Sequence, residues 1–582
     1  MKCRSLFFLV VLCVLSAPVA NAFALEREAF SFTNYDLKVR IEPEQQRLGV
    51  RGKITLRNDS ASPQKIAVLQ ISSSLDWRSI RAGGKQLQFV SQPYTSDIDH
   101  TGVLSEAIVT LPETIPPKGT VDLEIAYEGI IVLDVTRLTR IGTPDSIARS
   151  TDWDQISTKF TAVRGVGNVT WYPVATEAAD ISDNLFETVG KWRQREYSSA
   201  MHLQIELSTS DEEEKPELLV NATACPTARE VDEQFLADCT YHSIGSAVPT
   251  FLIADYEIVD RTAITVHFLR GHNAAATTYA DTAEKALPLV TDWFGSPRSK
   301  AETADLSDSS AAPFESGSLL LMPLAAADPK LSGLVATHQL THAAFFSPRP
   351  WINEGLAHFA QALYLEHQNG RQSALDYIKV HSTAFGVTEE EKQKASAPSS
   401  EEEKTWSLIN TYDEQLYRSK AMCVWWMLRD MVGDSALKKA LASYRPEEDK
   451  EPSYMQRLIQ AQTKQDLEWF FDDWIYRDRG LPDFKVESAF TRQTLPAGYM
   501  VTITVKNQGN AGAEVPLTVK FAGGELTQRL TVRGNSTAVT RVELQKPPEE
   551  IIVNDGSVPE SDITNNVFKV PASDTPTDST PK

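Results

Sequence analysis

The sequence predicts a multidomain α+β protein in which a mainly helical region lies between two β regions. Apolar and polar residues alternate with a period of two from about Phe30 to Ile264, as half-buried strands require. Apolar residues recur at helical spacing from about Asn273. Beyond Gly480 the period of two returns over roughly ninety residues, a length that suits one β-sandwich. At 582 residues the chain is long enough for several domains.

The changes of period bound the expected domains. We place a first, mostly antiparallel β domain at residues 23–265, where Gly and Pro clusters separate the strands. A helical domain follows at 266–484 and begins with a long helix, Ala274 to Phe294, that Gly295 ends. The second β domain, at 485–571, has the size of an immunoglobulin-like sandwich.

Three stretches are less regular. Residues 572–582 are rich in Pro, Thr, Ser and Asp, and we expect them to be disordered. The run from Glu389 to Lys404 is charged and rich in Ser, which is typical of a solvated loop, although it could be a lid. Asp134 to Phe186 has little periodicity, and its loops could reach over a site.

The first 22 residues have the pattern of a signal peptide. Lys2 and Arg4 give a positive start, Leu6 to Leu15 is apolar, and Ala20-Asn21-Ala22 suits a cleavage site. The apolar run is too short to span a membrane, and no other segment has that length. We therefore expect a soluble mature chain, exported to a periplasmic or extracellular space, with no transmembrane segment.

The net charge narrows the classes of partner, and the cysteines indicate where a disulfide could form. The formal charge of −21 argues against binding to nucleic acid and against a polybasic membrane-surface protein. In an oxidising compartment Cys225 and Cys239 could form a disulfide, and Cys423 in an apolar helical run reads as a buried thiol. Three unpaired thiols are the alternative.

One short stretch indicates a metal site. His338 and His342 are four residues apart, so on a helix they share one face and can bind one ion. Glu354, in the first turn of a second helix that we expect to begin near Asn353, would complete a His2Glu set with an open fourth position. This is the H-E-x-x-H pattern with Gln339 in place of the glutamate. The alternative is a chance pair, one histidine solvated and one in a core.

The chain resembles the M1 family of gluzincin metallopeptidases, which includes membrane alanyl aminopeptidases. Tyr35-Asp36-Leu37 and Gly52 to Leu56 are similar to the start of the family's N-terminal β saddle, and Trp293-Phe294-Gly295 to the end of the first helix in its thermolysin-like domain. The resemblance implies a β saddle, a thermolysin-like mainly helical catalytic domain and a C-terminal immunoglobulin-like sandwich, without the family's large helical fourth domain.

The resemblance also implies roles for particular residues. His338, His342 and Glu354 fall on the ligands of one zinc ion. Glu315, in Ala312-Pro313-Phe314-Glu315-Ser316, falls on the carboxylate that binds the free amine of a substrate. Tyr417 lies near the tyrosine that stabilises the oxyanion. Peptides or protein N-termini would then be the partners.

The departures from the family pattern concern the chemistry. Gln339 stands where the general base is expected, and an amide has no basic lone pair to accept a proton from water. Only eleven residues separate His342 from Glu354, so the connecting loop is short. Tyr417 is one residue further from Lys420 than the family pattern has it. His358, one turn after Glu354, could support a ligand, replace one, or lie on the surface.

Three functions are compatible with these residues. The first is an exported M1-like zinc metallopeptidase homologue, impaired by Gln339, that retains zinc and peptide binding. The second is an active aminopeptidase in which another group, such as Glu315 or His358, is the base, although a base must lie within hydrogen-bond reach of the reacting water. The third is a non-enzymatic binding protein with a vestigial metal site.

Overall fold

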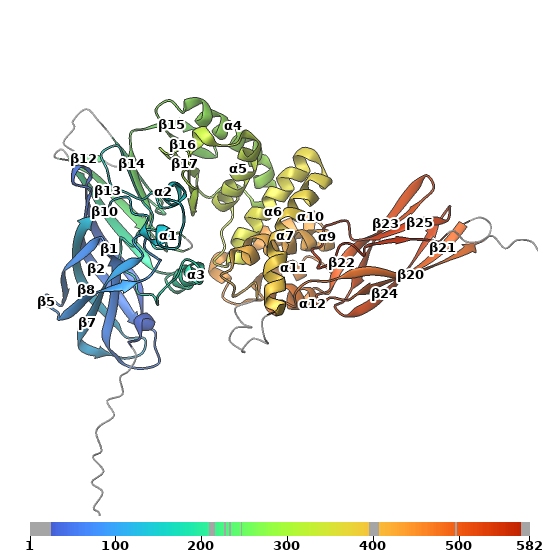
Figure 1. Cartoon of the computed structure of the whole chain (residues 1–582), viewed down its shortest axis with the longest axis horizontal. Helices are drawn as coiled ribbons and strands as arrows, with labels where there is room; N and C mark the ends of the chain where they lie inside the picture. The colour runs from blue at the N-terminus through green and yellow to red at the C-terminus, as the bar shows by residue number, and fades with distance from the viewer. Residues whose placement is uncertain are drawn as a thin grey trace, which may run out of the picture.

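The computed structural model describes residues 25–208, 216–225, 229–231, 234–245, 247–394, 407–494 and 498–571. The expected signal peptide, the expected tail and residues 395–404 of the charged run lie outside these ranges. Within them, a region of β sheets is followed by a helical region and by further β sheets, so the predicted fold class is confirmed (Figure 1). The domain boundaries remain predictions.

The N-terminal region is built on an eight-stranded sheet with the order β12-β13-β10-β1-β2-β8-β4-β5. Neighbouring strands are antiparallel except for β1 and β10, which run parallel. Two three-stranded sheets, β3-β7-β6 and β11-β14-β9, lie in the same described region. The bounds are β1 Phe30–Glu42, β2 Arg47–Asn58, β3 Gln64–Ser72, β4 Leu75–Ala82, β5 Lys85–Gln86, β6 Phe89–Thr95, β7 Val103–Ile115, β8 Thr120–Ile130, β9 Phe160–Val163, β10 Ala200–Ser208, β11 Glu217–Val220, β12 Arg229–Val231, β13 Gln234–Tyr241 and β14 Phe251–Ala254.

Strand β1 shows why the sequence predicted these sheets. Tyr35, Leu37 and Val39 are buried, whereas Asp36 is exposed on the opposite face. The Tyr35 hydroxyl donates a hydrogen bond to the Pro173 carbonyl at 3.0 Å, which satisfies its buried polar atom.

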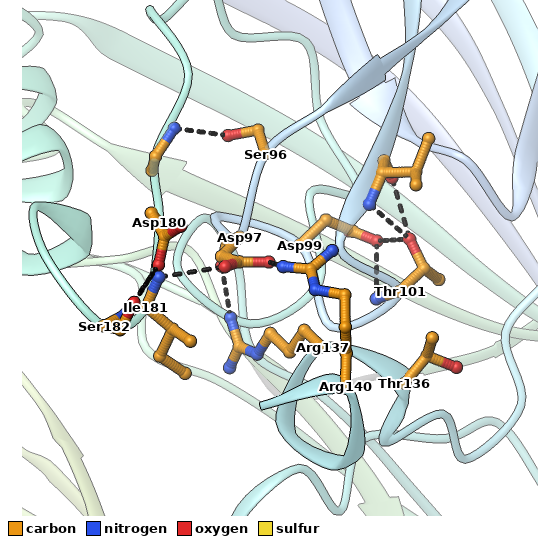
Figure 2. Close-up of polar contacts among 12 residues, drawn as sticks. Ser96, Asp97, Asp99, Thr101, Thr136, Arg137, Arg140, Asp180, Ile181 and Ser182 are labelled. Atoms are coloured by element: carbon orange, nitrogen blue, oxygen red, sulfur yellow. Dashed lines mark hydrogen bonds and ion pairs between the residues drawn. The ribbon is translucent and has the colours of Figure 1, made fainter. Parts of the chain in front are cut away.

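Asp97 ties three parts of the N-terminal region together (Figure 2). Its carboxylate accepts hydrogen bonds from the Arg140 guanidinium at 2.6 Å and from the Ile181 backbone N–H at 2.9 Å. Its backbone carbonyl accepts a hydrogen bond from Arg137 at 2.6 Å. Because Asp97 and Arg137 are almost fully buried, these bonds hold the weakly periodic stretch from Asp134 to Phe186 against the β region.

That stretch also contacts the helical region. It forms α1 (Thr136–Arg140), α2 (Asp145–Thr151) and β9, and it leads into α3 (Leu185–Arg195). The indole N–H of Trp153 donates to the Ala312 carbonyl at 3.1 Å, three residues before Glu315. The N-terminal region therefore supports the segment that carries a predicted site residue.

A buried glutamate in the N-terminal region gives a pH-dependent contribution to stability. Arg195 and Ser199 donate to the Glu196 carboxylate at 3.1 Å each, yet burial raises its pKa to about 7. Since the folded pKa lies above the unfolded value, the stabilisation is complete below about pH 4.5 and is lost as the pH rises through 7. We expect this group to lower the free energy of unfolding by up to about 3 kcal/mol between acid and pH 8.

Urea unfolding at several pH values tests this contribution. The Glu196→Gln variant should lose the corresponding slope. Glu187→Gln removes a carboxylate from α3 whose side chain is 44% exposed, and it should leave the slope unchanged. Identical slopes in all three proteins would contradict the assignment.

The helical region opens with a five-stranded mixed sheet in the order β15-β16-β17-β19-β18. Its first strand along the chain begins at Tyr256. The strand bounds are β15 Tyr256–Asp260, β16 Ile264–Leu269, β17 Ala301–Asp305, β18 Phe314–Ser316 and β19 Leu319–Met322. The helix bounds are α4 Asn273–Phe294, α5 Pro329–Ala344, α6 Pro350–Asn369, α7 Arg371–Lys394, α9 Ala421–Val432, α10 Asp434–Ser443, α11 Tyr454–Gln460 and α12 Glu468–Phe471, and η4, a π-helix, spans Gln415–Lys420.

The structure confirms the long helix and changes two details nearby. Helix α4 ends at Phe294, and Gly295 follows with φ of +88°, as predicted. Helix α6 begins at Pro350 rather than near Asn353, because proline at the first helical position presets φ and removes an N–H that would have no partner. Glu389 was expected in a solvated run, but it is buried and pairs with Lys420 at 2.7 Å.

The C-terminal region has two sheets, β20-β21-β24 and β23-β22-β25-β26. Val501 and Ile503 from the first sheet and Leu517 and Val519 from the second are fully buried in one core, as in a sandwich. The strand bounds are β20 Phe484–Thr494, β21 Gly498–Asn507, β22 Ala513–Phe521, β23 Gly524–Val532, β24 Ser536–Leu544, β25 Pro548–Val553 and β26 Val567–Lys569.

Two further expectations concern the cysteines and the possibility of a membrane-spanning helix. Cys225 and Cys239 form a disulfide, and Cys423 is a buried free thiol. Over the part of the chain that the structure describes, every helix is too short or too polar to cross a membrane.

Candidate metal centre

Helix α5 presents the two histidines to one point. Asp328 caps the helix by accepting a hydrogen bond from the Lys330 N–H at 2.9 Å, and Pro329 occupies its first position. The Nε2 atoms of His338 and His342 lie 3.1 Å apart, which is the convergence expected from i and i+4 on one face.

Glu354 reaches the same point from α6 in spite of the short connection. Its Oε1 lies 3.4 Å from Nε2 of His342, and its Oε2 lies 3.8 Å from Nε2 of His338. A hydrogen bond from the Ser347 N–H to Oδ1 of Asn353, at 3.1 Å, joins the connecting segment to the start of α6. The eleven-residue spacing therefore still places Glu354 beside both histidines.

Glu315 also belongs to this cluster. Its Oε2 lies 3.2 Å from Nε2 of His338, and the ligand atoms of Glu315, His338 and His342 are all within 4.8 Å of one another. The sequence predicted Glu315 beside the cleft as a partner for a peptide amine. The structure places its carboxylate as near to a histidine as the Glu354 carboxylate is.

The donor set fits a zinc ion. Imidazole nitrogens and carboxylate oxygens are common zinc ligands, and tetrahedral coordination at about 2.0–2.2 Å sets ligand atoms roughly 3.3 Å apart. Three donor separations, 3.1, 3.2 and 3.4 Å, match that edge, and the separation between His338 and Glu354 is 3.8 Å. The cluster can therefore hold one zinc ion.

Electrostatics keep the Glu354 carboxylate ionised and shift the pKa values of the two histidines in opposite directions. Burial alone would raise the pKa of Glu354, but His342 and Arg418 outweigh it and hold that pKa far below its usual range. Burial lowers the pKa of His342, so its imidazole tends to be neutral. Burial likewise opposes protonation of His338, but Glu315 outweighs it and raises that pKa.

Arg418 is a site residue that the sequence did not reveal. Its Nε lies 3.4 Å from Oε2 of Glu354, and its Nη1 lies 3.1 Å from Glu414. Tyr417 was predicted to stabilise an oxyanion, but its hydroxyl donates to Glu414 at 3.1 Å. The π-helix η4 accommodates an extra residue here. In the family pattern the tyrosine stands two residues before the lysine. In this chain the residue two before Lys420 is Arg418.

His358 lies beside His338 and is partly buried. Its ring centroid is 4.9 Å from that of His338 and 5.4 Å from that of His381. Its Nδ1 atom is enclosed and has no hydrogen-bond partner among the described residues. The ring therefore packs against a candidate ligand.

Gln339 points into the fold, where its amide is fully hydrogen-bonded. Oε1 accepts from the hydroxyls of Tyr279 in α4 and Thr303 in β17, at 3.0 Å each. Nε2 donates to the carbonyls of Glu302 at 2.7 Å and Ser318 at 3.2 Å. The side chain is 1% exposed. It joins α5 to the sheet and has no hydrogen-bonding capacity left for a water molecule.

The partner of His342 suggests a way to strengthen the site. Asn353 accepts from Ser347 through Oδ1, so its Nδ2 faces Nδ1 of His342 at 3.1 Å. A histidine that binds a metal through Nε2 carries its proton on Nδ1 and needs an acceptor there. In Asn353→Asp one carboxylate oxygen would accept from Nδ1 of His342 and the other would still accept from the Ser347 N–H. We therefore expect zinc to bind at least about 10-fold more tightly. Competition with a chelator would measure this, and an unchanged or weaker affinity would contradict it.

Comparisons with known proteins gave one family match and several similar solved structures. Residues 348–474 match the profile of the Peptidase family M1 domain. No match was found among curated proteins. Among solved structures, the M1 zinc metallopeptidase from Deinococcus radiodurans is similar at 16% identity with a TM-score of 0.46, over 77% of this chain and 94% of that chain. A mutant M1 zinc metallopeptidase from that organism, bound to a Tyr-Ser-Ala substrate, is similar at 15% identity with a TM-score of 0.47, over 78% and 96%.

The matched segment begins after His342 and contains Glu354, His358 and Arg418, three residues of the centre described above. The resemblance inferred from the sequence is thereby confirmed. Residues 348–474 therefore form a segment that matches the Peptidase family M1 domain.

Proposed function

We propose that this chain is an exported M1-type zinc metallopeptidase homologue that holds one zinc ion and hydrolyses peptides poorly or not at all. His338, His342 and Glu354 are the proposed ligands. The observation that carries the proposal is the environment of Gln339, whose amide makes four hydrogen bonds inside the fold.

The missing group is a proton acceptor. A bound zinc ion supplies Lewis acidity, which polarises a carbonyl and acidifies a bound water. Hydrolysis also needs a group that accepts the proton of the attacking water, and loss of such a base typically costs about 10²–10⁴-fold in rate. Gln339 has no basic atom, and both of its polar atoms are already occupied.

The match to the Peptidase family M1 domain favours peptides as the ligands of this site. Glu315 is the proposed partner for a free N-terminal amine, since a carboxylate and an ammonium group form a charge-assisted hydrogen bond. Arg418 adds a cation beside the Glu354 carboxylate. A peptide could therefore be bound at both a positive and a negative group without being cleaved.

Export is supported by two observations. The first 22 residues have the charge and hydropathy pattern of a signal peptide. The disulfide between Cys225 and Cys239 is of a kind that persists in oxidising compartments such as a periplasm. Detection of the protein without residues 1–22 in a periplasmic or culture fraction would test this part.

The central test measures metal content and turnover together. The purified mature protein should contain about one zinc ion per chain and release almost no amino acid from a panel of aminoacyl amides. His342→Ala should abolish zinc binding, which locates the ion. Rapid turnover by the unaltered protein would favour an active aminopeptidase with another base. Absence of zinc would favour a non-enzymatic binding protein that uses its β regions.

A further inference from the structure

We propose that Glu315 is a fourth zinc ligand, so that this centre is closed by four protein side chains instead of keeping a position for water. The inference rests on the proposed function to the extent that the site must hold zinc. It changes the role of Glu315 from a binder of peptide amines to a ligand in the zinc-loaded protein.

The first support is the geometry of the donors. Oε2 of Glu315 is 3.2 Å from Nε2 of His338, closer than either carboxylate oxygen of Glu354 is to a histidine nitrogen. The separation equals the edge expected for two ligands of one tetrahedral zinc ion, about 3.3 Å. If Glu315 only bound a substrate amine, its carboxylate would lie farther from His338 and leave space for that amine.

The second support is the lack of another partner for this carboxylate. Oε1 of Glu315 is enclosed and has no hydrogen-bond donor among the described residues. Oε2 contacts only the His338 ring in the same part of the chain. The side chain is 27% exposed, but its enclosed oxygen, Oε1, is costly without a donor, and a divalent cation beside the carboxylate would remove that cost.

The third support is that the strand carrying Glu315 is fixed from both sides. The Ser316 hydroxyl accepts from the Val248 N–H at 2.8 Å and from Nδ2 of Asn221 at 2.9 Å, both in the N-terminal region. After the turn at Gly317, where φ is +66°, the Ser318 carbonyl accepts from Gln339 at 3.2 Å. Gln339 therefore positions the β18–β19 turn so that Glu315 meets His338.

In this arrangement Gln339 has a structural role. A glutamate at position 339 could not donate to the Ser318 carbonyl when ionised. The amide closes the contact between α5 and the turn, and the turn brings the fourth ligand to the ion. Two His and two carboxylates form a neutral, fully coordinated site, the type that stabilises a fold more than it promotes hydrolysis.

The experiment compares zinc coordination and zinc affinity in the unaltered mature protein and in two variants of it. X-ray absorption at the zinc edge should show two histidines and two carboxylate ligands in the unaltered protein, without a coordinated water. Glu315→Gln should replace one oxygen ligand by water and weaken zinc binding at least about 100-fold in a chelator competition. Glu414→Gln, which removes a carboxylate on Arg418 without removing a ligand, should weaken it less than about 10-fold.

The outcomes separate this inference from the proposed function. If the unaltered protein binds no zinc, the proposed function fails, and the inference fails with it. If zinc binds with a coordinated water and Glu315→Gln leaves the affinity unchanged, only the inference is overturned. If Glu315→Gln weakens binding of a peptide with a free amine but not binding of zinc, the amine-binding role stands instead.

Discussion

Replacing Gln339 by glutamate is expected to destabilise the protein and not to create a peptidase. A carboxylate at this position would face the Glu302 and Ser318 carbonyls, which now accept hydrogen bonds from the amide. Loss of both donors and burial of a charge should lower the free energy of unfolding by about 2–4 kcal/mol at pH 8. Since the introduced carboxyl would have a raised pKa, the loss should shrink in acid, where the carboxyl is neutral.

Gln361 provides a matched control for that substitution. It is buried in α6, accepts from the Tyr377 hydroxyl at 2.7 Å and donates to one carbonyl, that of Leu334, at 3.1 Å. Gln361→Glu should therefore cost less than Gln339→Glu in denaturant unfolding at the same pH. If Gln339→Glu is as stable as the unaltered protein and hydrolyses aminoacyl amides rapidly, the glutamine alone silences an otherwise complete enzyme.

Replacing Lys420 by methionine should destabilise the fold even more than Gln339→Glu does. The Lys420 ammonium group is fully buried, lies 2.7 Å from Glu389 and pairs also with Asp478. Without the cation, two buried carboxylates would face each other, which typically costs about 3–5 kcal/mol. Urea or thermal unfolding would measure the loss.

Two further variants show whether the loss comes from uncompensated charge. Lys438→Met removes a lysine that pairs with Asp292, whose side chain is 61% exposed, and it should cost less than about 1 kcal/mol. Combining Lys420→Met with Glu389→Gln and Asp478→Asn should recover part of the stability. A triple variant that is no more stable than Lys420→Met would point to packing around the lysine stem instead.

The sequence predicted well those features that depend on local periodicity. Alternation at Tyr35, Leu37 and Val39 predicted β1, and helical spacing with Gly295 predicted α4 and its end. The His338–His342 pair required only the helix repeat. These features need no knowledge of which segments meet.

Features that depend on distant contacts were not predictable. The approach of Glu315 to His338 depends on how β18 is held by Val248 and Asn221, far away in the chain. The burial of Glu389 depends on Lys420, and a charged run gives no sign of that. Arg418 was missed because the π-helix shifts the register of the side chains by one residue.

The strand β18 contacts the N-terminal β region through Ser316 and carries Glu315 to the histidines of α5. Occupancy of the centre and docking of the two regions are therefore linked equilibria: whatever free energy the ion gains from Glu315 also opposes separation of the regions. Chelation should increase amide hydrogen exchange at β18 and at the Val248 contact well away from the ion. The metal would then report whether the two halves of the chain are assembled.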